Sequence, residues 1–298
     1  MIDAEPAEKK FRRIAPGEAL PEALLGGVVA IGNFDGVHRG HQAVLERALD
    51  LARATGRPAL VLTFEPHPRT HFKPETPVFR LTPPPLKARL LALAGFDAVI
   101  ECAFDGEFAA QLAEDFIRGI VERRLGATHV VTGFDFHFGK GRAGGPAYLM
   151  EAGERLGFAV TLVDAFRDEN VEVVSSSRIR ALIGKGEVAT AAGLLGYRFA
   201  VEAPVIGGKK LGRTLGFPTA NMALPPETTL APGIYAVRYR RPCGTLHDGV
   251  ASFGPIEDEG VVRALKHALR DLIGLDDDDD DDEDTEEGSI FGGPVPEA

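Results

Sequence analysis

The chain has 298 residues, and 44% of them are hydrophobic, which is enough for about two packed domains. No apolar run approaches the roughly 20 residues of a membrane-spanning helix, and the charged segment 1–13 lacks the apolar centre of a secretion signal. The net charge of −11 is concentrated between residues 276 and 287, where eleven acidic side chains lie, and the remaining 33 Asp and Glu match the 33 Lys and Arg. The body of the chain therefore has no basic excess that would indicate a nucleic-acid partner.

The first half of the chain alternates strand and helix patterns, which predicts an α/β fold with a parallel sheet and helices on both faces. Pro83–Pro85 mark the entry to a helix over Leu86–Ala94. A second helix is predicted over residues 107–124, where apolar side chains recur at intervals of three and four and Gly126 follows. Five apolar runs are predicted strands: Val28–Ile31, Ala59–Phe64, Ala98–Ala103, His129–Thr132 and Ala159–Val163.

The pattern changes near Lys185–Gly186. A short helix, Glu187–Leu195, precedes three strand-like runs, which predict a partial antiparallel β-barrel or sheet. The runs are Arg198–Ile206, Gly233–Arg240 and His247–Ser252, with turns at Gly207–Gly208 and 242–244. A helical pattern over 261–275 and the acidic segment follow; that segment is predicted to be disordered and dispensable, because it repels itself and has little to bury.

Only two cysteines are present, and they predict no disulfide framework. Cys102 lies in an apolar run and is predicted to pack as a small hydrophobic side chain, whereas Cys243 lies in a Pro-Cys-Gly turn. This usage fits a reducing cytosol, so we expect a cytoplasmic protein.

The most informative motif joins the first apolar strand to a helix. Residues 31–41 read Ile-Gly-Asn-Phe-Asp-Gly-Val-His-Arg-Gly-His, and a helix is expected to open at Gln42. Gly40 allows the backbone to approach a ligand, and the free N–H groups of a helix start favour an anion. His38 and His41 could donate hydrogen bonds to phosphate oxygens as charge develops on them. The alternatives are a metal site or an accidental pair, and no third ligand stands at metal spacing.

Three further motifs follow predicted strands. Val174–Arg180 reads Val-Ser-Ser-Ser-Arg-Ile-Arg at a helix start, where hydroxyl groups and an arginine can bind phosphate, or where a serine simply caps the helix. Residues 131–139 place Asp135, which looks buried, among three phenylalanines; these could hold a flat aromatic ligand or form an ordinary strand edge with a glycine turn. His67, in Phe-Glu-Pro-His-Pro, is equally compatible with a loop histidine.

Together these motifs resemble the bacterial bifunctional riboflavin kinase/FMN adenylyltransferase family, also called FAD synthetase. The resemblance covers roughly residues 14–254 and includes Gly-Arg-Thr-Leu-Gly-Phe-Pro-Thr-Ala-Asn at 212–221, which is similar to the kinase signature. It implies a Rossmann-like adenylyltransferase domain over 14–186, a riboflavin kinase-like β domain over 187–260, and a helix with a tail over 261–298. ATP, FMN and riboflavin are the implied small-molecule substrates, FAD is a product, and Mg²⁺ is the implied metal.

The resemblance also implies roles for individual residues. The implied catalytic residues are His38, His41 and Arg180; the first two would contact ATP phosphates. The implied ATP-binding residues are Gly32, Phe34, Gly40, Ser176 and Ser177. The implied flavin-binding residues are Asp135, Phe136, His67 and Arg142. In the second module, Gly212, Thr219 and Asn221 would serve the nucleotide, with Thr219 and Asn221 also holding the metal.

The sequence departs from the family after Val250–Gly254. Where the family continues with strands and a catalytic glutamate, this chain reads Pro-Ile-Glu-Asp-Glu-Gly, with no strand pattern around Glu257 or Glu259. Three strands leave an open sheet with unpaired edges, so we expect an incomplete module with impaired riboflavin kinase activity. The alternative functions are a different small-molecule nucleotidylyltransferase or a non-catalytic flavin- or nucleotide-binding protein. The sequence leaves the oligomeric state open.

Overall fold

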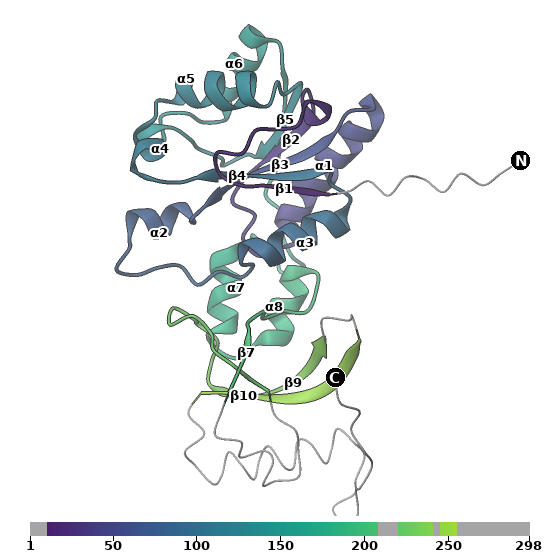
Figure 1. Ribbon diagram of the computed structural model, residues 1–298, viewed down its shortest axis with the longest axis vertical. Coiled ribbons are helices and arrows are strands. Elements are labelled where there is room, and N and C mark those ends of the chain that lie inside the picture. The colour runs from purple at the N-terminus through teal and green to yellow at the C-terminus, as the bar shows by residue number, and fades with distance from the viewer. Residues whose placement is uncertain (1–10, 208–219, 241–244, 255–298) are drawn as a thin grey trace, which may run out of the picture. The chain divides into compact units, whose positions relative to one another are not determined.

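The computed structural model describes residues 11–207, 220–240 and 245–254. The chain divides into two compact units, one ending at Leu230 and the other beginning at Ala231 (Figure 1). Several predictions lie outside the described residues, namely the helix over 261–275, the disordered tail, the Cys243 turn, Gly212 and Thr219.

The first unit is built around a six-stranded sheet of order β1-β4-β3-β2-β5-β6, in which every pairing is parallel. This confirms the predicted α/β class. The strands are β1 (Arg12–Ile14), β2 (Val28–Ile31), β3 (Ala59–Glu65), β4 (Ala98–Ala103), β5 (His129–Gly133) and β6 (Ala159–Val163). Five of them coincide with the predicted strands to within one residue at each end, whereas β1 was not predicted because it has only three residues, two of them arginines.

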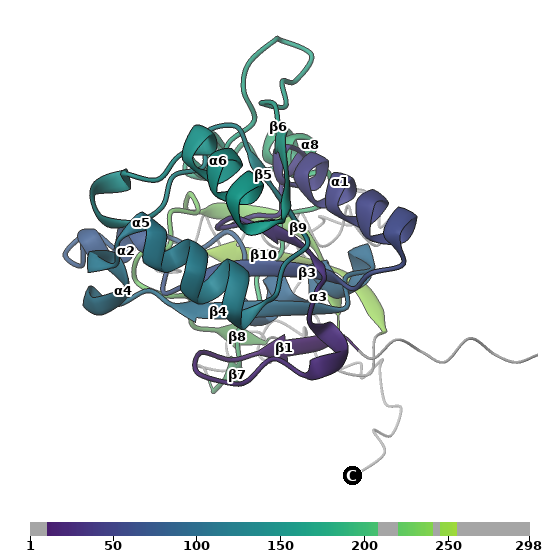
Figure 2. The same ribbon diagram turned by 90° about the horizontal axis from the view of Figure 1, so that it is seen from above.

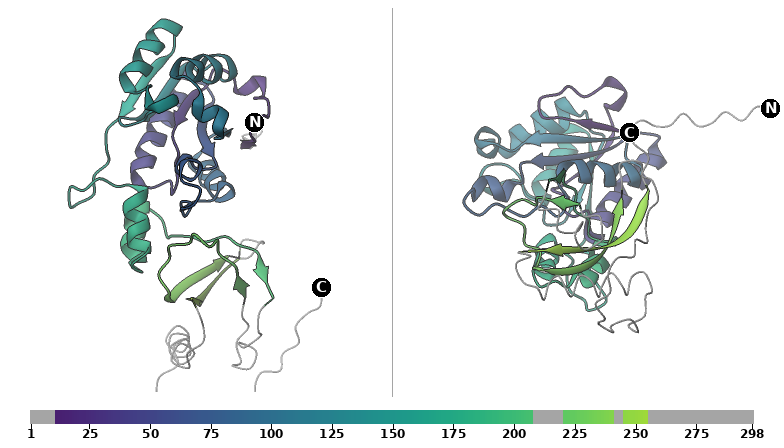
Figure 3. Two further views of the ribbon diagram at one scale, coloured as in Figure 1. Left: turned by 90° about the vertical axis from the view of Figure 1, so that its left-hand side faces the viewer. Right: turned by 60° about the horizontal axis from the view of Figure 1, so that its bottom comes forward.

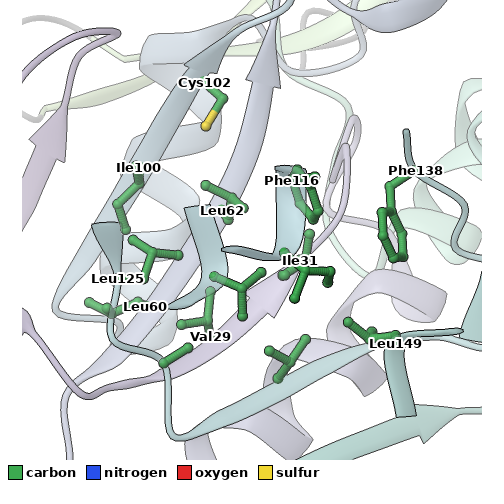
Figure 4. Close-up of a cluster of buried hydrophobic side chains, with 14 of the residues drawn as sticks. Val29, Ile31, Leu60, Leu62, Ile100, Cys102, Phe116, Leu125, Phe138 and Leu149 are labelled. Carbon is green, nitrogen blue, oxygen red and sulfur yellow. The ribbon is translucent and has the colours of Figure 1, made fainter. Parts of the chain in front are cut away.

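Helices cover both faces of the sheet, as predicted (Figures 1 and 2). Successive strand residues point to opposite faces, so Val29 and Ile31 pack on one side while Val28 and Ala30 pack on the other. The first side is covered by α5 (Ala113–Phe116), the π-helical segment η2 (Ile117–Arg124) and α6 (Pro146–Leu156), and Figure 4 shows its buried side chains. The second side is covered by α1 (Arg39–Thr55) and α3 (Pro84–Ala94).

Cys102 is confirmed as a core residue at 2% exposure, and burial raises the pKa of its thiol to about 11. It packs with the strand residues of the first face (Figure 4). Within the described residues, no helix is both long and apolar enough to cross a lipid bilayer.

The single helix predicted over 107–124 is wrong. The segment forms α4 (Gly106–Ala110), a break at Gln111 and Leu112, and then α5 and η2. Gln111 and Leu112 are extended, and the Gln111 carbonyl accepts the backbone N–H of Lys140 at 2.7 Å, so it serves the neighbouring loop and not a helix. Hydrophobic periodicity continues through such a break because both sides bury the same face.

Two helices follow the sheet, α7 (Ser176–Ile183) and α8 (Val188–Leu195), and they share a third apolar cluster with Phe79 and Leu81. The strand predicted over Arg198–Ile206 is confined to β7 (Val205–Ile206), because Phe199 packs into that apolar cluster. The short connecting elements are η1 (Glu22–Leu24), α2 (Pro68–Phe72) and η3 (Lys140–Arg142).

Two antiparallel pairs confirm the predicted antiparallel β region. β7 pairs with β8 (Asn221–Met222), and β9 (Gly233–Arg240) pairs along its length with β10 (Leu246–Phe253). The second pair forms the curved ribbon drawn in yellow-green (Figure 3).

Candidate nucleotide-binding site

The topology of the sheet has a switch point between β2 and β5, where a ligand crevice is expected. The chain leaves β2 toward β3 on one side and leaves β5 toward β6 on the other, so the connections diverge at this point. In open α/β sheets, ligands bind at such a switch point, outside the carboxyl ends of the strands. Ile31 pairs with Thr132 near these ends, so the loops that follow β2 and β5 start side by side.

The loop after β2 is a tight turn. Phe34 and Val37 both have positive φ angles, 47° and 37°, which non-glycine residues rarely adopt. Such strained backbone persists only where surrounding contacts hold it. Phe34 and Val37 are both buried, and Thr82 Oγ1 accepts the Gly36 N–H at 2.8 Å.

The Asp35 carboxylate is the main anchor of this turn. It is 1% exposed and accepts the backbone N–H groups of Leu81 and Thr82 at 3.3 and 3.0 Å. Its two ion-pair partners are Arg80, with 3.4 Å between Nε and Oδ1, and Arg180. Arg80 and Arg180, assisted by the two N–H groups, hold the pKa of Asp35 below its usual range despite burial.

His38 and His41 lie face to face at the start of α1. Their ring centroids are 3.6 Å apart with an interplanar angle of 17°, and the edge of Phe34 meets His41. The predicted helix start at Gln42 is wrong by one turn: α1 begins at Arg39, and the His38 side chain caps it by accepting the His41 N–H at 3.3 Å. His41 therefore lies in the first turn, where free backbone N–H groups favour anions.

Glycines allow the close packing of this turn. A Cβ on Gly40 would lie 3.2 Å from the His38 ring and 3.3 Å from the Val174 carbonyl oxygen, so a side chain there would crowd the first histidine. A Cβ on Gly32 would lie 3.0 Å from the Phe34 ring. The structure thus gives Gly32, Phe34 and Gly40 a role in shaping the turn, and their contact with ATP remains a prediction.

Both imidazoles are neutral at pH 7. Burial lowers the pKa of His38 to about 4, and burial together with the positive charges nearby lowers the pKa of His41 well below its usual range. The Nδ1 atom of His41 is buried and has no hydrogen-bond partner among the residues that the structure describes. A neutral imidazole keeps one N–H donor, which suits hydrogen bonding to a phosphate oxygen.

The lowered pKa of His38 predicts a pH-dependent stability. Between pH 6.5 and 4 the unfolded chain binds a proton on this imidazole that the folded protein does not, so the free energy of unfolding falls as the pH is lowered through that window. Urea denaturation between pH 7.5 and 5 measures the slope. His38→Asn keeps a side-chain acceptor at the helix start but cannot titrate, so we expect its slope to be smaller by up to about 1.4 kcal/mol per pH unit. An unchanged slope would contradict this assignment.

A chain of ion pairs between buried and partly buried side chains supports the turn and was not predicted. Glu65, at the end of β3, accepts hydrogen bonds from Nη1 and Nη2 of Arg80, at 2.7 and 2.9 Å, and from the Lys87 ammonium at 2.7 Å. Lys87 is 1% exposed and also donates to Thr63 Oγ1 and to the Asn33 carbonyl, at 2.9 and 3.1 Å. The chain therefore runs from Lys87 through Glu65, Arg80 and Asp35 to Arg180.

These ion pairs join three cations, Lys87, Arg80 and Arg180, to two carboxylates, Glu65 and Asp35. One positive charge is therefore left in excess beside the histidine turn. Buried charges interact strongly because little water screens them. An anionic ligand such as a phosphate would complete the charge balance, so the electrostatics agree with the helix start in favouring an anion.

The serine motif lies on the same turn. The Ser175 side chain caps α7 by accepting the Arg178 N–H, and Ser176 Oγ donates to the Asp35 carbonyl at 2.8 Å. The structure thus brings Ser176 and Arg180 together with the histidine turn. Ser177 is exposed in the first turn of α7. The capping interpretation is correct for Ser175, and phosphate binding by Ser176 and Ser177 stays a prediction.

The loop after β5 differs from the expectation in one respect: Asp135 is exposed, not buried. Phe138 takes the buried position, and Phe136 is partly buried and stacks on it with 5.6 Å between centroids. Arg142 approaches the exposed His137, with 3.1 Å between Nη2 and Nδ1. Asp135 is thereby available to solvent at the switch point, and its role and that of Arg142 remain predictions.

The His67 side chain caps the start of α2, and its contact with flavin remains a prediction. Its Nδ1 accepts the Arg69 N–H at 3.1 Å at the start of α2, and burial together with the charge of Arg80 lowers its pKa to about 4. In the antiparallel region, Asn221 is an exposed residue of β8.

The described residues offer no carboxylate cluster for a metal. They contain no group of three or more His, Cys, Asp and Glu side chains that could hold a metal ion. Asp35 and Glu65 are both committed to ion pairs with arginine or lysine. Mg²⁺ that enters such sites is held largely by substrate phosphates and water, so we assign no described residue of this crevice as its ligand.

Comparison with protein families gives two matches that divide the chain. Residues 20–178 match the FAD synthetase family, and residues 195–270 match the riboflavin kinase family. The second match includes 255–270, which follow the point where the sequence departs from the kinase pattern.

Relatives from three bacteria carry the name bifunctional riboflavin kinase/FMN adenylyltransferase. The protein of Escherichia coli K12 is 40% identical over 71% of this chain and 67% of its own length. Those of Haemophilus influenzae and Listeria monocytogenes are each 39% identical, covering 78% and 76% of this chain and 75% and 72% of their own lengths. A crystal structure from Streptococcus pneumoniae, titled a macrolide-efflux protein, superposes with a TM-score of 0.72 at 28% identity, covering 84% of this chain and 81% of that one.

Proposed function

Because the chain belongs to the family of bifunctional riboflavin kinase/FMN adenylyltransferases, we propose that it transfers AMP from ATP to FMN, giving FAD and pyrophosphate. The observation that carries this proposal is the stacked pair of neutral histidines at the start of α1, at the switch point of the sheet. The excess positive charge beside them supports a polyphosphate substrate.

The reaction needs no protein nucleophile. An oxygen of the FMN phosphate attacks the α-phosphorus of ATP, a new P–O–P bond forms, and the bond to the β-phosphate breaks with its electron pair leaving on pyrophosphate. Catalysis is then positioning and stabilisation of charge on phosphate oxygens. His38 and His41 donate hydrogen bonds to these oxygens, and Arg180 with Ser176 and Ser177 holds the departing phosphates. Mg²⁺ accompanies ATP and neutralises phosphate charge when bound.

The remaining site residues complete the proposal. Gly32, Phe34 and Gly40 form the wall against ATP, and the loop with Asp135, Phe136 and Arg142 meets the flavin or ribose together with His67. We propose that residues 14–186 carry adenylyl transfer. Residues 187–260 carry the kinase module, with Gly212, Thr219 and Asn221 at its nucleotide and metal site.

One assay tests this function and separates it from the alternatives. The pure protein is incubated with Mg-ATP and FMN, and the flavins are separated by chromatography. We expect FAD and stoichiometric pyrophosphate. A different nucleotidylyltransferase would consume ATP only with another acceptor. A non-catalytic binding protein would retain FMN or nucleotide without product, and either result would reject the proposal.

The same assay with riboflavin in place of FMN tests the kinase module. Phosphoryl transfer requires the acceptor hydroxyl to be held in line with the metal-bound phosphates. The sequence after Gly254 lacks the strand pattern that would supply a wall and a base, so we expect riboflavin to be converted to FMN far more slowly than the about 1–100 s⁻¹ of ordinary kinases. A rate within that range would refute the predicted impairment.

A further inference from the structure

The segment that leads out of α8 is bonded directly to the histidine turn. The Tyr197 hydroxyl donates to the Gly36 carbonyl at 2.6 Å. The Gln42 side-chain amide donates to the Leu195 carbonyl and to the Val37 carbonyl, each at 2.8 Å. His38 lies in sequence between the two points that these bonds fix, so residues 195–197 hold the turn on both sides of the first histidine.

The two segments are packed too closely for this contact to be incidental. Gly196 ends α8 with a φ of 79°, and a Cβ there would lie 3.0 Å from Gln42 Oε1. On the other side, Gly36 has a φ of 90°, and a Cβ there would lie 2.9 Å from Leu81 and 3.5 Å from Leu195. Tyr197 itself packs into the apolar cluster beneath α7 and α8, which fixes its ring. Each glycine thus lets a side chain of the opposite segment approach the backbone closely, Gln42 at Gly196 and Leu195 at Gly36.

The Tyr197 hydroxyl remains protonated and therefore a donor. Burial and the nearby negative charge of Asp35 both raise the pKa of Tyr197. Its acceptor, the Gly36 carbonyl, belongs to the turn whose Phe34 and Val37 have strained backbone angles. Strained turns keep their conformation only while such contacts persist.

We propose that Tyr197 is a positioning residue of the adenylyl-transfer site, which holds the Gly36 carbonyl and thereby the alignment of His38 and His41. Tyr197 lies in the stretch that matches the riboflavin kinase family, beyond the end of the FAD synthetase match at residue 178. A residue counted with one module thus serves the other. The proposal rests on the proposed adenylyl transfer, and its test separates the two.

The test compares Tyr197→Phe with a matched control in the full-length protein. Tyr148→Phe also removes one phenol hydrogen bond, of 2.8 Å to Glu114, on α6. If the whole free energy of one neutral hydrogen bond stabilises the transition state, its loss lowers the rate roughly fivefold. We expect Tyr197→Phe to lower kcat for FAD formation about three- to tenfold. We expect Tyr148→Phe to leave kcat unchanged, although its melting temperature should shift by about as much as that of Tyr197→Phe. Equal kcat values for the two variants would overturn the proposal.

A spectroscopic test of the positioning role does not depend on FAD formation. If the parent protein makes no FAD, the proposed function is rejected, but the effect of Tyr197 on the histidine turn can still be measured. In ¹H–¹³C spectra of histidine-labelled protein, Tyr197→Phe is expected to shift the imidazole signals of His38 and His41 and leave that of His129, at the N-terminal end of β5, in place. Unmoved His38 and His41 signals would overturn the positioning role. Gln42→Met, which removes two hydrogen bonds from the same turn, is expected to give the larger shift and the larger loss of kcat. If Tyr197→Phe fails to fold, normal kcat and unmoved signals in Gln42→Met overturn the proposal.

Discussion

His41→Ala is expected to lower kcat for FAD formation by about 10²–10³, the usual cost of removing one donor to transition-state charge. His41 stacks on His38 and meets the edge of Phe34, so its ring is held in one orientation. Burial and the positive charges nearby hold its pKa well below the usual range, so the imidazole is neutral at pH 7. Because the donor acts mainly as charge develops, the KM for FMN should change far less than kcat.

His129→Ala is the matched control for this prediction. His129 also has a pKa lowered by partial burial and bonds Thr161 at 2.8 Å. It starts β5, however, and so lies at the N-terminal end of the strands, whereas the histidine turn follows the C-terminal end of β2. Steady-state assays of both variants, with melting temperatures to establish folding, decide the matter. Turnover in His41→Ala within tenfold of the parent protein would remove His41 from the catalytic assignment.

The four inner strands of the sheet could be predicted from the sequence because they are short apolar runs that are buried on both faces. Such runs carry their signal locally, and β2 and β4 match their predicted bounds. The break at Gln111 could not be predicted, because it depends on a hydrogen bond to Lys140, 29 residues further along the chain. β7 was overestimated for the same reason: Phe199 fits a strand pattern but serves a different apolar cluster.

The candidate site divides in the same way. Four of the predicted site residues lie in local motifs. In the structure, Ser176 and Arg180 of α7 contact the turn that carries His38 and His41. Arg80 and Lys87 lie in no motif, and Glu65 lies in the Phe-Glu-Pro-His-Pro motif, where only His67 was given a role. Their role comes from meeting across segments that are distant in the sequence. One signal was available for Lys87: it is a cation on the buried side of a helix whose neighbours Leu86 and Ala88 are core residues. A lysine there needs a buried partner.

That burial leads to the second large effect. Lys87→Met is expected to destabilise the protein by about 3–5 kcal/mol, as happens when one partner of a buried ion pair is removed. The change leaves Glu65 with Arg80 alone, and it removes the donors to Thr63 Oγ1 and the Asn33 carbonyl. Lys185→Met, at an exposed position after α7, is the control and should stay within about 0.5 kcal/mol of the parent protein. Urea denaturation of both variants measures the difference.

The double variant Glu65→Gln/Lys87→Met tests whether the loss of stability in Lys87→Met comes from the broken ion pair with Glu65 or from the other contacts of Lys87. If Lys87 is needed chiefly to balance Glu65, the two losses are coupled, and the double variant should be more stable than the sum of the single effects implies, by about 1–3 kcal/mol. Glu65 also binds Arg80, which in turn reaches Asp35 and the histidine turn, so part of the loss must remain. Strict additivity would mean that Lys87 acts only through its bonds to Asn33 and Thr63. A Lys87→Met protein as stable as the Lys185→Met control would contradict both accounts, because a buried ammonium that can be lost without cost is not holding the turn.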